Sequence, residues 1–417
     1  MRKVIREKNS LSILEIYVPT TKSYFPKLRF PEFSDEWVQT TLGKCSEALE
    51  YGMNSAAITF DGENKYIRIT DIDEASSKYT PNIPVSPEGD LEDKYLVKEN
   101  DILLARTGAS TGKSYLYNIK DGKLYFAGFL IKVKVKHSNN ASFIFNQTKT
   151  SQYQKWVKIM SMRSGQPGIN SKEYASFKFW VPSKLEQDRI ANFLSLVDER
   201  IATQNKIIED YKLLKKGLMQ KIFKQEIRFK DENGNYYPKW EVRKLGEVAD
   251  ITMGQSPDSK SYNDNKTGFP LIQGNADIQN RVSSPRQWTN QPTKVCDISD
   301  LILTVRAPVG SISKSIHNAC IGRGVCAIKN KSIINIDFLY QLLLWYEPKW
   351  VRVEQGSTFT AVSGKDIKNL KFLIPNLQEQ QKIAATLSAI DKKIALEEGH
   401  LDKLKAQKKY LLQNLFV

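Results

Sequence analysis

The clearest pattern in the chain is a heptad-like spacing of apolar residues that occurs twice, in residues 181–223 and again in residues 374–416. The two stretches align without a gap, 193 positions apart, so that Pro182 corresponds to Pro375 and Asp198 to Asp391. Apolar residues about every 3.5 positions are typical of helices that bury a seam against another helix. The predicted coiled-coil interface is Ile190, Leu194, Val197, Ile201, Ile208, Tyr211, Leu218 and Ile222 with Ile383, Leu387, Ile390, Ile394, Leu401, Leu404, Leu411 and Leu415.

Both seams become polar at the same two layers, Gln204 with Glu397 and Lys215 with Lys408. Such residues can fix the register of a coiled coil, or they can lie with their stems along the seam and their charged heads in water. The pattern leaves both interpretations open. Each stretch, at about 1.5 Å per residue, predicts a helix of roughly 60 Å.

The repeat extends backwards through the whole chain. Residues 28–30 reappear as residues 227–229, and residues 101–108 correspond to residues 300–310. The intervening sequence alternates short β-branched and aromatic runs with turn residues, which predicts strands. The predicted strands are 65–70, 101–105, 123–135, 301–305 and 325–328, and the predicted shorter helices are 140–162 and 336–346.

The duplication predicts the architecture. After an N-terminal extension (residues 1–24), each half consists of a mixed domain followed by a helical region: domain 1 (25–180), helical region 1 (181–226), domain 2 (227–373) and helical region 2 (374–417). A two-fold arrangement of the halves closes if the long helices run antiparallel. We therefore predict an α+β fold with two similar mixed α/β domains separated by two long helices that form an antiparallel coiled coil with pseudo-two-fold symmetry.

The charge balance indicates the kind of partner. The chain has 62 Lys and Arg against 46 Asp and Glu, a net charge of +16, which suits a polyanion, either nucleic acid or an anionic membrane face. The sequence has no apolar run near 18 residues and no secretory cleavage pattern, so we expect no membrane association and a cytoplasmic location. Four cysteines without a close-paired framework fit a reducing compartment.

Two similar basic domains held apart by helices suit a DNA duplex that is contacted at two places. Lys and Arg would supply affinity through phosphates, and polar loop side chains would read base edges. Because the two domains differ much more than the two helices, they would read two different sequences. The helices would have to bind their partners in the same way at both copies.

Several motifs resemble one known family. Residues 26–37 (PKLRFPEFSDEW), residues 101–113 (DILLARTGASTGK), the two helix starts at Glu186–Gln187 and Glu379–Gln380, and the paired helix ends LMQKIF and LLQNLF resemble the specificity subunit of bacterial type I restriction–modification systems. The resemblance covers about residues 25–417 and leaves out residues 1–24.

The resemblance implies two target recognition domains, each reading one part of an asymmetric bipartite DNA site. It also implies that two methyltransferase subunits bind the helical regions and that motor-nuclease subunits join the complex. S-adenosylmethionine for adenine N6 methylation, and ATP and Mg²⁺ for restriction, would lie on those partners. No cofactor, metal or catalytic residue is expected in this chain.

The candidate DNA-contacting residues are polar or basic side chains in segments predicted to be loops or strand ends. Arg106 and Arg306 end equivalent strands, and Lys113 and Lys314 are expected to share the loops that follow. The full set is Arg68, Thr70, Arg106, Thr107, Lys113, Arg163 and Gln166 in the first half and Gln273, Asn275, Arg306, Lys314, Gln355, Ser357 and Thr358 in the second. A structural or solvent-exposed role is the alternative for each of them.

Other readings find less support. Residues 108–114 resemble a phosphate-binding loop but have three residues between the glycines where that motif needs four. His317, Cys320 and Cys326 match no common zinc spacing. A stand-alone DNA methyltransferase or nuclease, and a coiled-coil scaffold that meets DNA only through charge, are the two alternative functions.

Overall fold

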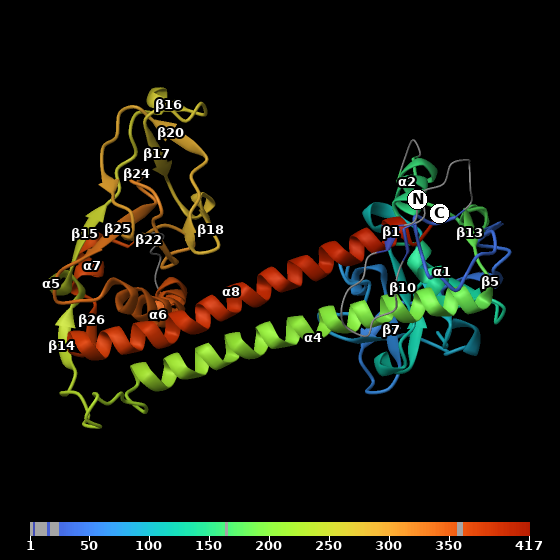
Figure 1. Cartoon of the computed structure of the whole chain (residues 1–417), viewed down its shortest axis with the longest axis horizontal. Helices are drawn as coiled ribbons and strands as arrows, with labels where there is room; N and C mark the ends of the chain where they lie inside the picture. Colours follow the sequence, from blue (N-terminus) through green and yellow to red (C-terminus); the bar gives the residue numbers. More distant parts are fainter. Residues whose placement is uncertain (1–2, 5–14, 17–24, 163–165, 357–361) are drawn as a thin grey trace. The chain divides into compact units, whose positions relative to one another are not determined.

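The computed structural model describes residues 3–4, 15–16, 25–162, 166–356 and 362–417, with side chains from residue 25 onward except those of residues 351–356. The chain divides into two compact units: unit 1 is Met1–Gln204 with His400–Val417, and unit 2 is Asn205–Gly399. Two long helices, α4 (Lys184–Phe223) and α8 (Leu377–Asn414), are visible in Figure 1, and each contributes one part to each unit.

The globular part of unit 1 is built around an antiparallel sheet with strand order β10-β9-β12-β5. The unit also contains a parallel pair of strands, β7 with β11. Two antiparallel pairs, β6–β8 and β13–β4, and the three-stranded sheet β1-β2-β3 complete it. Its strands are β1 (Lys3–Val4), β2 (Glu15–Ile16), β3 (Leu28–Arg29), β4 (Val38–Thr41), β5 (Ser46–Tyr51), β6 (Ala57–Thr59), β7 (Lys65–Ile67), β8 (Val85–Pro87), β9 (Asp101–Ala105), β10 (Ser114–Leu116), β11 (Leu124–Phe126), β12 (Leu130–Val135) and β13 (Lys178–Val181).

The globular part of unit 2 has a sheet of order β15-β25-β22-β23-β19-β18, a second sheet of order β16-β20-β17-β24-β21, and the pair β14–β26. Its strands are β14 (Glu241–Lys244), β15 (Ala249–Met253), β16 (Tyr262–Asn263), β17 (Phe269–Ile272), β18 (Ile278–Gln279), β19 (Val282–Ser283), β20 (Gln287–Thr289), β21 (Val295–Cys296), β22 (Leu301–Thr304), β23 (Ile312–Lys314), β24 (Ala319–Ile321), β25 (Val325–Asn330) and β26 (Lys371–Ile374).

The two globular parts share one plan. The order β5-β12-β9-β10 in unit 1 matches β15-β25-β22-β23 in unit 2, and the parallel pair β7–β11 matches β17–β24. Every residue of β9 and of β22 is buried, as expected for central strands that are covered on both faces. The predicted mixed α/β domains are therefore confirmed, and so is their similarity.

The shorter helices correct the sequence analysis. The single helix predicted for residues 140–162 is wrong, because Thr148 ends α1 and the side chain of Thr150 accepts from the Tyr153 N–H to start α2. The helix predicted for residues 336–346 is longer and continues through Pro348. The strand predicted for residues 123–135 is two strands, β11 and β12. The shorter helices are α1 (Ala141–Gln147), α2 (Ser151–Met160), α3 (Ser171–Ala175), α5 (Leu245–Val248), α6 (Ile336–Gly356) and α7 (Gly364–Asn369).

The halves of the long helices pack antiparallel within each unit. In unit 1 the first half of α4 shares a core with the end of α8, where Leu194 joins Leu411 and Leu415. In unit 2 the end of α4 shares a core with the start of α8, where Ile222 joins Ile383 and Leu387. All sixteen predicted interface residues are buried or half-buried. The predicted antiparallel pairing is confirmed within each unit.

The two lysines of the polar seam positions form ion pairs with the opposite helix. Lys215 Nζ lies 2.6 Å from Asp391 Oδ1 in unit 2, and Lys408 Nζ lies 2.5 Å from Asp198 Oδ1 in unit 1. Glu397 is buried and pairs with Lys393 on its own helix. The two lysines thus follow the register interpretation, since each reaches a carboxylate of the opposite helix rather than water alone.

Among the helices of the described residues, none combines the length and the apolar composition that a membrane span requires.

Candidate nucleic-acid interface

Each helical region is fixed to its globular part by the Glu–Gln pair at the helix start. Glu186 Oε1 and Oε2 accept hydrogen bonds from Arg29 Nε and Nη2, both at 2.8 Å. Gln187 accepts from the Asn140 N–H at the start of α1, and its own amide donates to the Pro182 carbonyl. The second copy makes matching contacts in unit 2, since Gln380 accepts from the Asn335 N–H and its amide donates to the Pro375 carbonyl.

In unit 1, Arg106 lies in a loop cluster at the carboxyl end of β9. Its N–H donates to the Phe129 carbonyl, and its Nη1 donates to the Gly128 carbonyl at 3.3 Å. The guanidinium carbon lies 4.8 Å from the ring centroid of Tyr51, which is the last residue of β5. Arg106 is half-buried, and its guanidinium is held on the face of this ring.

Thr107 and Gln166 lie in adjoining segments of this cluster. Thr107 forms a β-bridge with Gly168, and the Gly108 N–H donates to the Pro167 carbonyl at 2.9 Å. Gly108 has a φ of +69°, and a Cβ there would lie 3.2 Å from Gln166 Nε2. Gln166 is exposed, whereas Arg163 lies outside the described residues. The loops after β9 and α2 therefore lie side by side in unit 1.

The segment after β7 reaches the same cluster. The Ala127 N–H donates to the Ile67 carbonyl at 3.1 Å, so Arg68 follows a strand end that adjoins the turn between β11 and β12. Arg68 pairs with Asp71 in the short 3-10 helix η1 (Ile69–Asp71), and Thr70 is exposed in that helix. The pairing with Asp71 was missed in the sequence analysis, although an aspartate three residues after an arginine is a visible signal.

Unit 2 brings equivalent segments together. The Val305 N–H donates to the Gly324 carbonyl at 2.9 Å, and the Val362 N–H donates to the Val305 carbonyl at 3.1 Å. A Cβ on Gly324 would lie 2.2 Å from the Gln273 carbonyl oxygen, so this close approach requires glycine. Arg306 is exposed beside this cluster, and Asn275 is exposed in the short helix η6 (Asn275–Asp277).

The segment of unit 2 that contains residues 355–358 was predicted to be a loop, but its first part is helical. Gln355 was expected in a loop, but α6 continues to Gly356 and includes its backbone. Ser357 and Thr358 lie outside the described residues. The N–H of Val362, the first described residue after these, donates to the Val305 carbonyl, so the chain returns to the cluster next to Arg306.

The expectation that Lys314 shares the loop with Arg306 is wrong. Lys314 is in β23 and pairs with Leu301, the first residue of β22, whereas Arg306 lies two residues after Thr304, the last residue of that strand. Its Nζ forms an ion pair with Asp337 on α6. Lys113 does lie in the predicted loop, where its Nζ is 3.4 Å from Glu74 Oε2.

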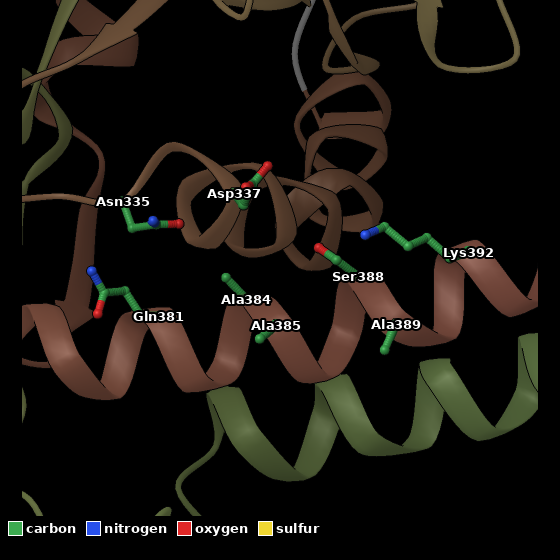
Figure 2. Close-up of a pocket in the computed structure, with 8 residues that line it drawn as sticks. All are labelled: Asn335, Asp337, Gln381, Ala384, Ala385, Ser388, Ala389 and Lys392. Atoms are coloured by element: carbon green, nitrogen blue, oxygen red, sulfur yellow. The ribbon is translucent and has the colours of Figure 1, made fainter.

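A shallow groove of about 330 Å³ lies on α8 beside the start of α6 (Figure 2). Ala384, Ala385, Ser388 and Ala389 line it with small side chains, and Asp337 borders it. Because Asp337 pairs with Lys314, the groove belongs to the opposite end of β22 from Arg306. It is a packing feature of α6 on α8 and is distinct from the loop cluster.

Two other chemistries that the sequence raised do not fit the geometry. Residues 108–114 connect β9 to β10, so the glycines lie in a strand-to-strand loop, whereas a phosphate-binding loop opens a helix. His317 Nδ1 shares a hydrogen bond with Ser283 Oγ at 2.8 Å. Burial raises the pKa of the Cys326 thiol to about 12, which disfavours the thiolate that a metal would need.

A duplicated α+β domain with arginine- and amide-bearing loops, followed each time by a coiled-coil helix, defines a class of two-domain protein whose loops suit contact with a DNA duplex at two places. Comparison with known proteins identifies the family to which the chain belongs. The family described as Type I restriction modification DNA specificity domain matches residues 35–211 and 237–406. The chain therefore belongs to the family of type I restriction–modification DNA specificity subunits.

Two individual relatives are also named as specificity subunits. A putative type I restriction enzyme MjaX specificity subunit from Methanocaldococcus jannaschii is 30% identical over 410 residues, which cover 94% of this chain and 95% of that protein. The MjaVIII specificity subunit of the same organism is 28% identical, with coverage of 77% and 79%.

Two solved structures share the fold. One chain comes from a study of complex assembly and conformational transition of the type I R-M system; it has a TM-score of 0.61 and 24% identity and covers 90% of this chain and 96% of its own length. The S subunit from M. genitalium has a TM-score of 0.59 and 18% identity, with coverage of 94% and 99%.

Proposed function

We propose that domain 1 and domain 2 each read one half of an asymmetric bipartite DNA site. The observation that carries this proposal is the loop cluster at the carboxyl end of β9 and its counterpart after β22. The two clusters have the same backbone plan but present different side chains. A matched scaffold with unlike loops is what reading two different half-sites requires.

The contacts would come from the accessible members of the two clusters. In domain 1 these are Arg68, Thr70, Arg106, Thr107 and Gln166, with Arg163 in the adjoining segment. In domain 2 they are Gln273, Asn275 and Arg306, with Gln355, Ser357 and Thr358 in the segment before Val362. Lys113 and Lys314 fit a phosphate contact less well, because carboxylates already engage their ammonium groups.

The helical regions would bind two methyltransferase subunits, and motor-nuclease subunits would complete the assembly. Adenine N6 methylation with S-adenosylmethionine, and restriction with ATP and Mg²⁺, would then be carried out by the partners. This chain would direct those reactions and catalyse neither. The net charge of +16 supports double-stranded DNA as its ligand. The complex would act in the cytoplasm.

A domain exchange tests the proposal. Residues 25–180 are replaced by the equivalent domain of another specificity subunit, and methylated adenines are sequenced in cells that carry the chain with its methyltransferase partner. We expect one half-site to change and the other to persist. A change in both halves would contradict modular reading, and methylation without sequence preference would favour a scaffold that binds DNA only through charge.

A further inference from the structure

Unit 1 contains a buried aspartate that holds an accessible arginine. Asp71 Oδ2 accepts from the Arg68 N–H and from Arg68 Nε, and Asp71 Oδ1 accepts from Arg68 Nη2, each at 2.9 Å. The side chain of Asp71 is 3% exposed and that of Arg68 is 35% exposed. The Asp71 backbone is fixed as well, because its carbonyl accepts from the Thr80 N–H at 2.8 Å.

Unit 2 contains the same arrangement at the equivalent place. Asp277 Oδ2 accepts from the Gln273 N–H at 2.9 Å, and Asp277 Oδ1 accepts from Arg286 Nε at 2.9 Å. The side chain of Asp277 is 7% exposed and that of Arg286 is 67% exposed. The Asp277 carbonyl accepts from the Ser284 N–H at 2.7 Å, as the Asp71 carbonyl does from Thr80.

The arginine lies at a different sequence position relative to the aspartate in each unit. Arg68 precedes its aspartate by three residues and caps η1, whereas Arg286 follows its aspartate by nine residues and directly precedes β20. In both units the aspartate ends a short helix that follows the first strand of the parallel pair, β7 or β17. What the diverged domains share is therefore an outward-facing guanidinium on a buried carboxylate.

A carboxylate that binds the inner edge of a guanidinium leaves outer N–H groups available. Asp277 uses Nε of Arg286, so both Nη groups can face a ligand. A fork that is fixed in advance suits the O6 and N7 acceptors of guanine, and it loses little side-chain entropy on binding. Arg68 adjoins the Ala127 turn of the first loop cluster. Arg286 is linked to the second cluster through Asp277, because Gln273, whose N–H donates to Asp277, adjoins Gly324.

We infer that Arg286 in domain 2 and Arg68 in domain 1 each read a guanine, and that Asp277 and Asp71 are the positioning residues that hold them. This inference rests on the proposed function, because it assigns side chains to the two half-sites. Arg286 is new to the set of candidate contacts, since no loop motif in the sequence singled it out. The competing structural role is neutralisation of a buried carboxylate, for which any cation would serve.

Arg286→Lys separates the two roles. Lysine keeps the positive charge beside Asp277 but lacks the planar fork. The full chain is produced with its methyltransferase partner, and methylated sites are sequenced in cells. We expect the variant to lose preference for one guanine in the half-site read by domain 2, by about tenfold or more, with an unchanged melting temperature.

Three further variants complete the test. Arg68→Lys should relax one guanine in the other half-site only. Asp277→Asn, which frees the guanidinium to move, should weaken the same guanine preference as Arg286→Lys but to a smaller extent. Arg243→Lys is the matched control, since Arg243 also pairs with an acidic residue, Glu241, on the surface of unit 2, and its site preference should stay that of the unchanged chain.

The following outcomes would contradict the inference or the proposed function. Unchanged base preference in Arg286→Lys, or uniformly weaker methylation that indicates a phosphate contact, would overturn the inference while the proposed function stands. If the unchanged chain directed methylation without sequence preference, the proposed function would fail and the inference with it.

Discussion

Arg29 and Glu186, which are 157 residues apart in the sequence, form a two-point ion pair that joins β3 to the start of α4. Trp37 Nε1 donates to the same carboxylate at 3.3 Å. The counterpart in unit 2 has the same residue types but a looser contact, since Arg228 Nη2 lies 3.4 Å from Glu379 Oε2. The duplicated motif has therefore kept its position while the strength of its contacts has diverged.

Glu186→Ala should strongly destabilise unit 1. The Arg29 side chain is 10% exposed, so the substitution leaves a buried guanidinium without its carboxylate. Breaking a buried ion pair from one side lowers the free energy of unfolding by about 3–5 kcal/mol. Urea denaturation followed by circular dichroism would measure it, and a loss below about 1 kcal/mol would contradict the assigned role.

Glu379→Ala is the matched variant in unit 2 and should cost less. Arg228 Nη2 also donates to the Tyr237 and Pro238 carbonyls, so it keeps acceptors after the substitution. Within the described part of the chain, Glu379 Oε1 has no hydrogen-bond partner to lose. We expect a loss of about 1–3 kcal/mol in the same denaturation experiment. A larger loss than that of Glu186→Ala would refute the comparison.

Lys215 and Asp391 should be energetically coupled across the helix seam. Their side chains are 13% and 39% exposed, so the pair is partly shielded from water. A double-mutant cycle with Lys215→Met and Asp391→Asn should give a coupling of about 1 kcal/mol. The more exposed pair Lys212–Glu398, at 55% and 48%, is the control and should give a coupling near zero. Equal couplings would show that the seam position adds nothing.

Lys149 should make stability depend on pH. Its ammonium donates to Ser77 Oγ and to Ser114 Oγ, and burial lowers its pKa from 10.5 to about 7. The unfolded state then binds more protons between pH 7 and pH 10.5, so this lysine makes stability rise with pH across that window and fall as the pH is lowered towards 7.

Lys149→Met should remove this rise, which is at most about 1.4 kcal/mol per pH unit. The measurement is the free energy of unfolding at several pH values between 7 and 10, with Lys155→Met at an exposed position of α2 as the control. The same pH slope in Lys149→Met and in the unchanged chain would disprove the assignment.

Lengthening α4 should alter the recognised spacing. Four residues inserted after Thr203 add about one turn, or roughly 6 Å, to the helix. We expect the methylated sites to show a different distance between half-sites, or methylation to be lost. The same insertion after Gly234, in an exposed turn, is the control. Retention of the original spacing after the α4 insertion would argue against a spacing role for the helix.

The sequence predicted the long helices and the duplicated domains well because those signals are local and repeated. The period of apolar residues from Ile190 onward depends only on neighbours along the helix. Helix ends were harder to predict from the sequence. Thr148 ends α1 and the side chain of Thr150 caps α2 with a hydrogen bond, which divides the helix predicted for residues 140–162, and the apolar pattern does not reveal this cap. Loops were least predictable, as the placement of Lys314 shows.

By itself, the sequence determined that this protein consists of two α+β halves, each ending in a seam-forming helix, and that its charge suits DNA. Only the tertiary structure decided which distant side chains meet: Glu186 with Arg29, Asp277 with Arg286, and Lys314 with Asp337 instead of the Arg306 loop. The physical reason is that periodicity is set by adjacent residues. Contacts between loops depend on strand order and register, which the whole chain settles together.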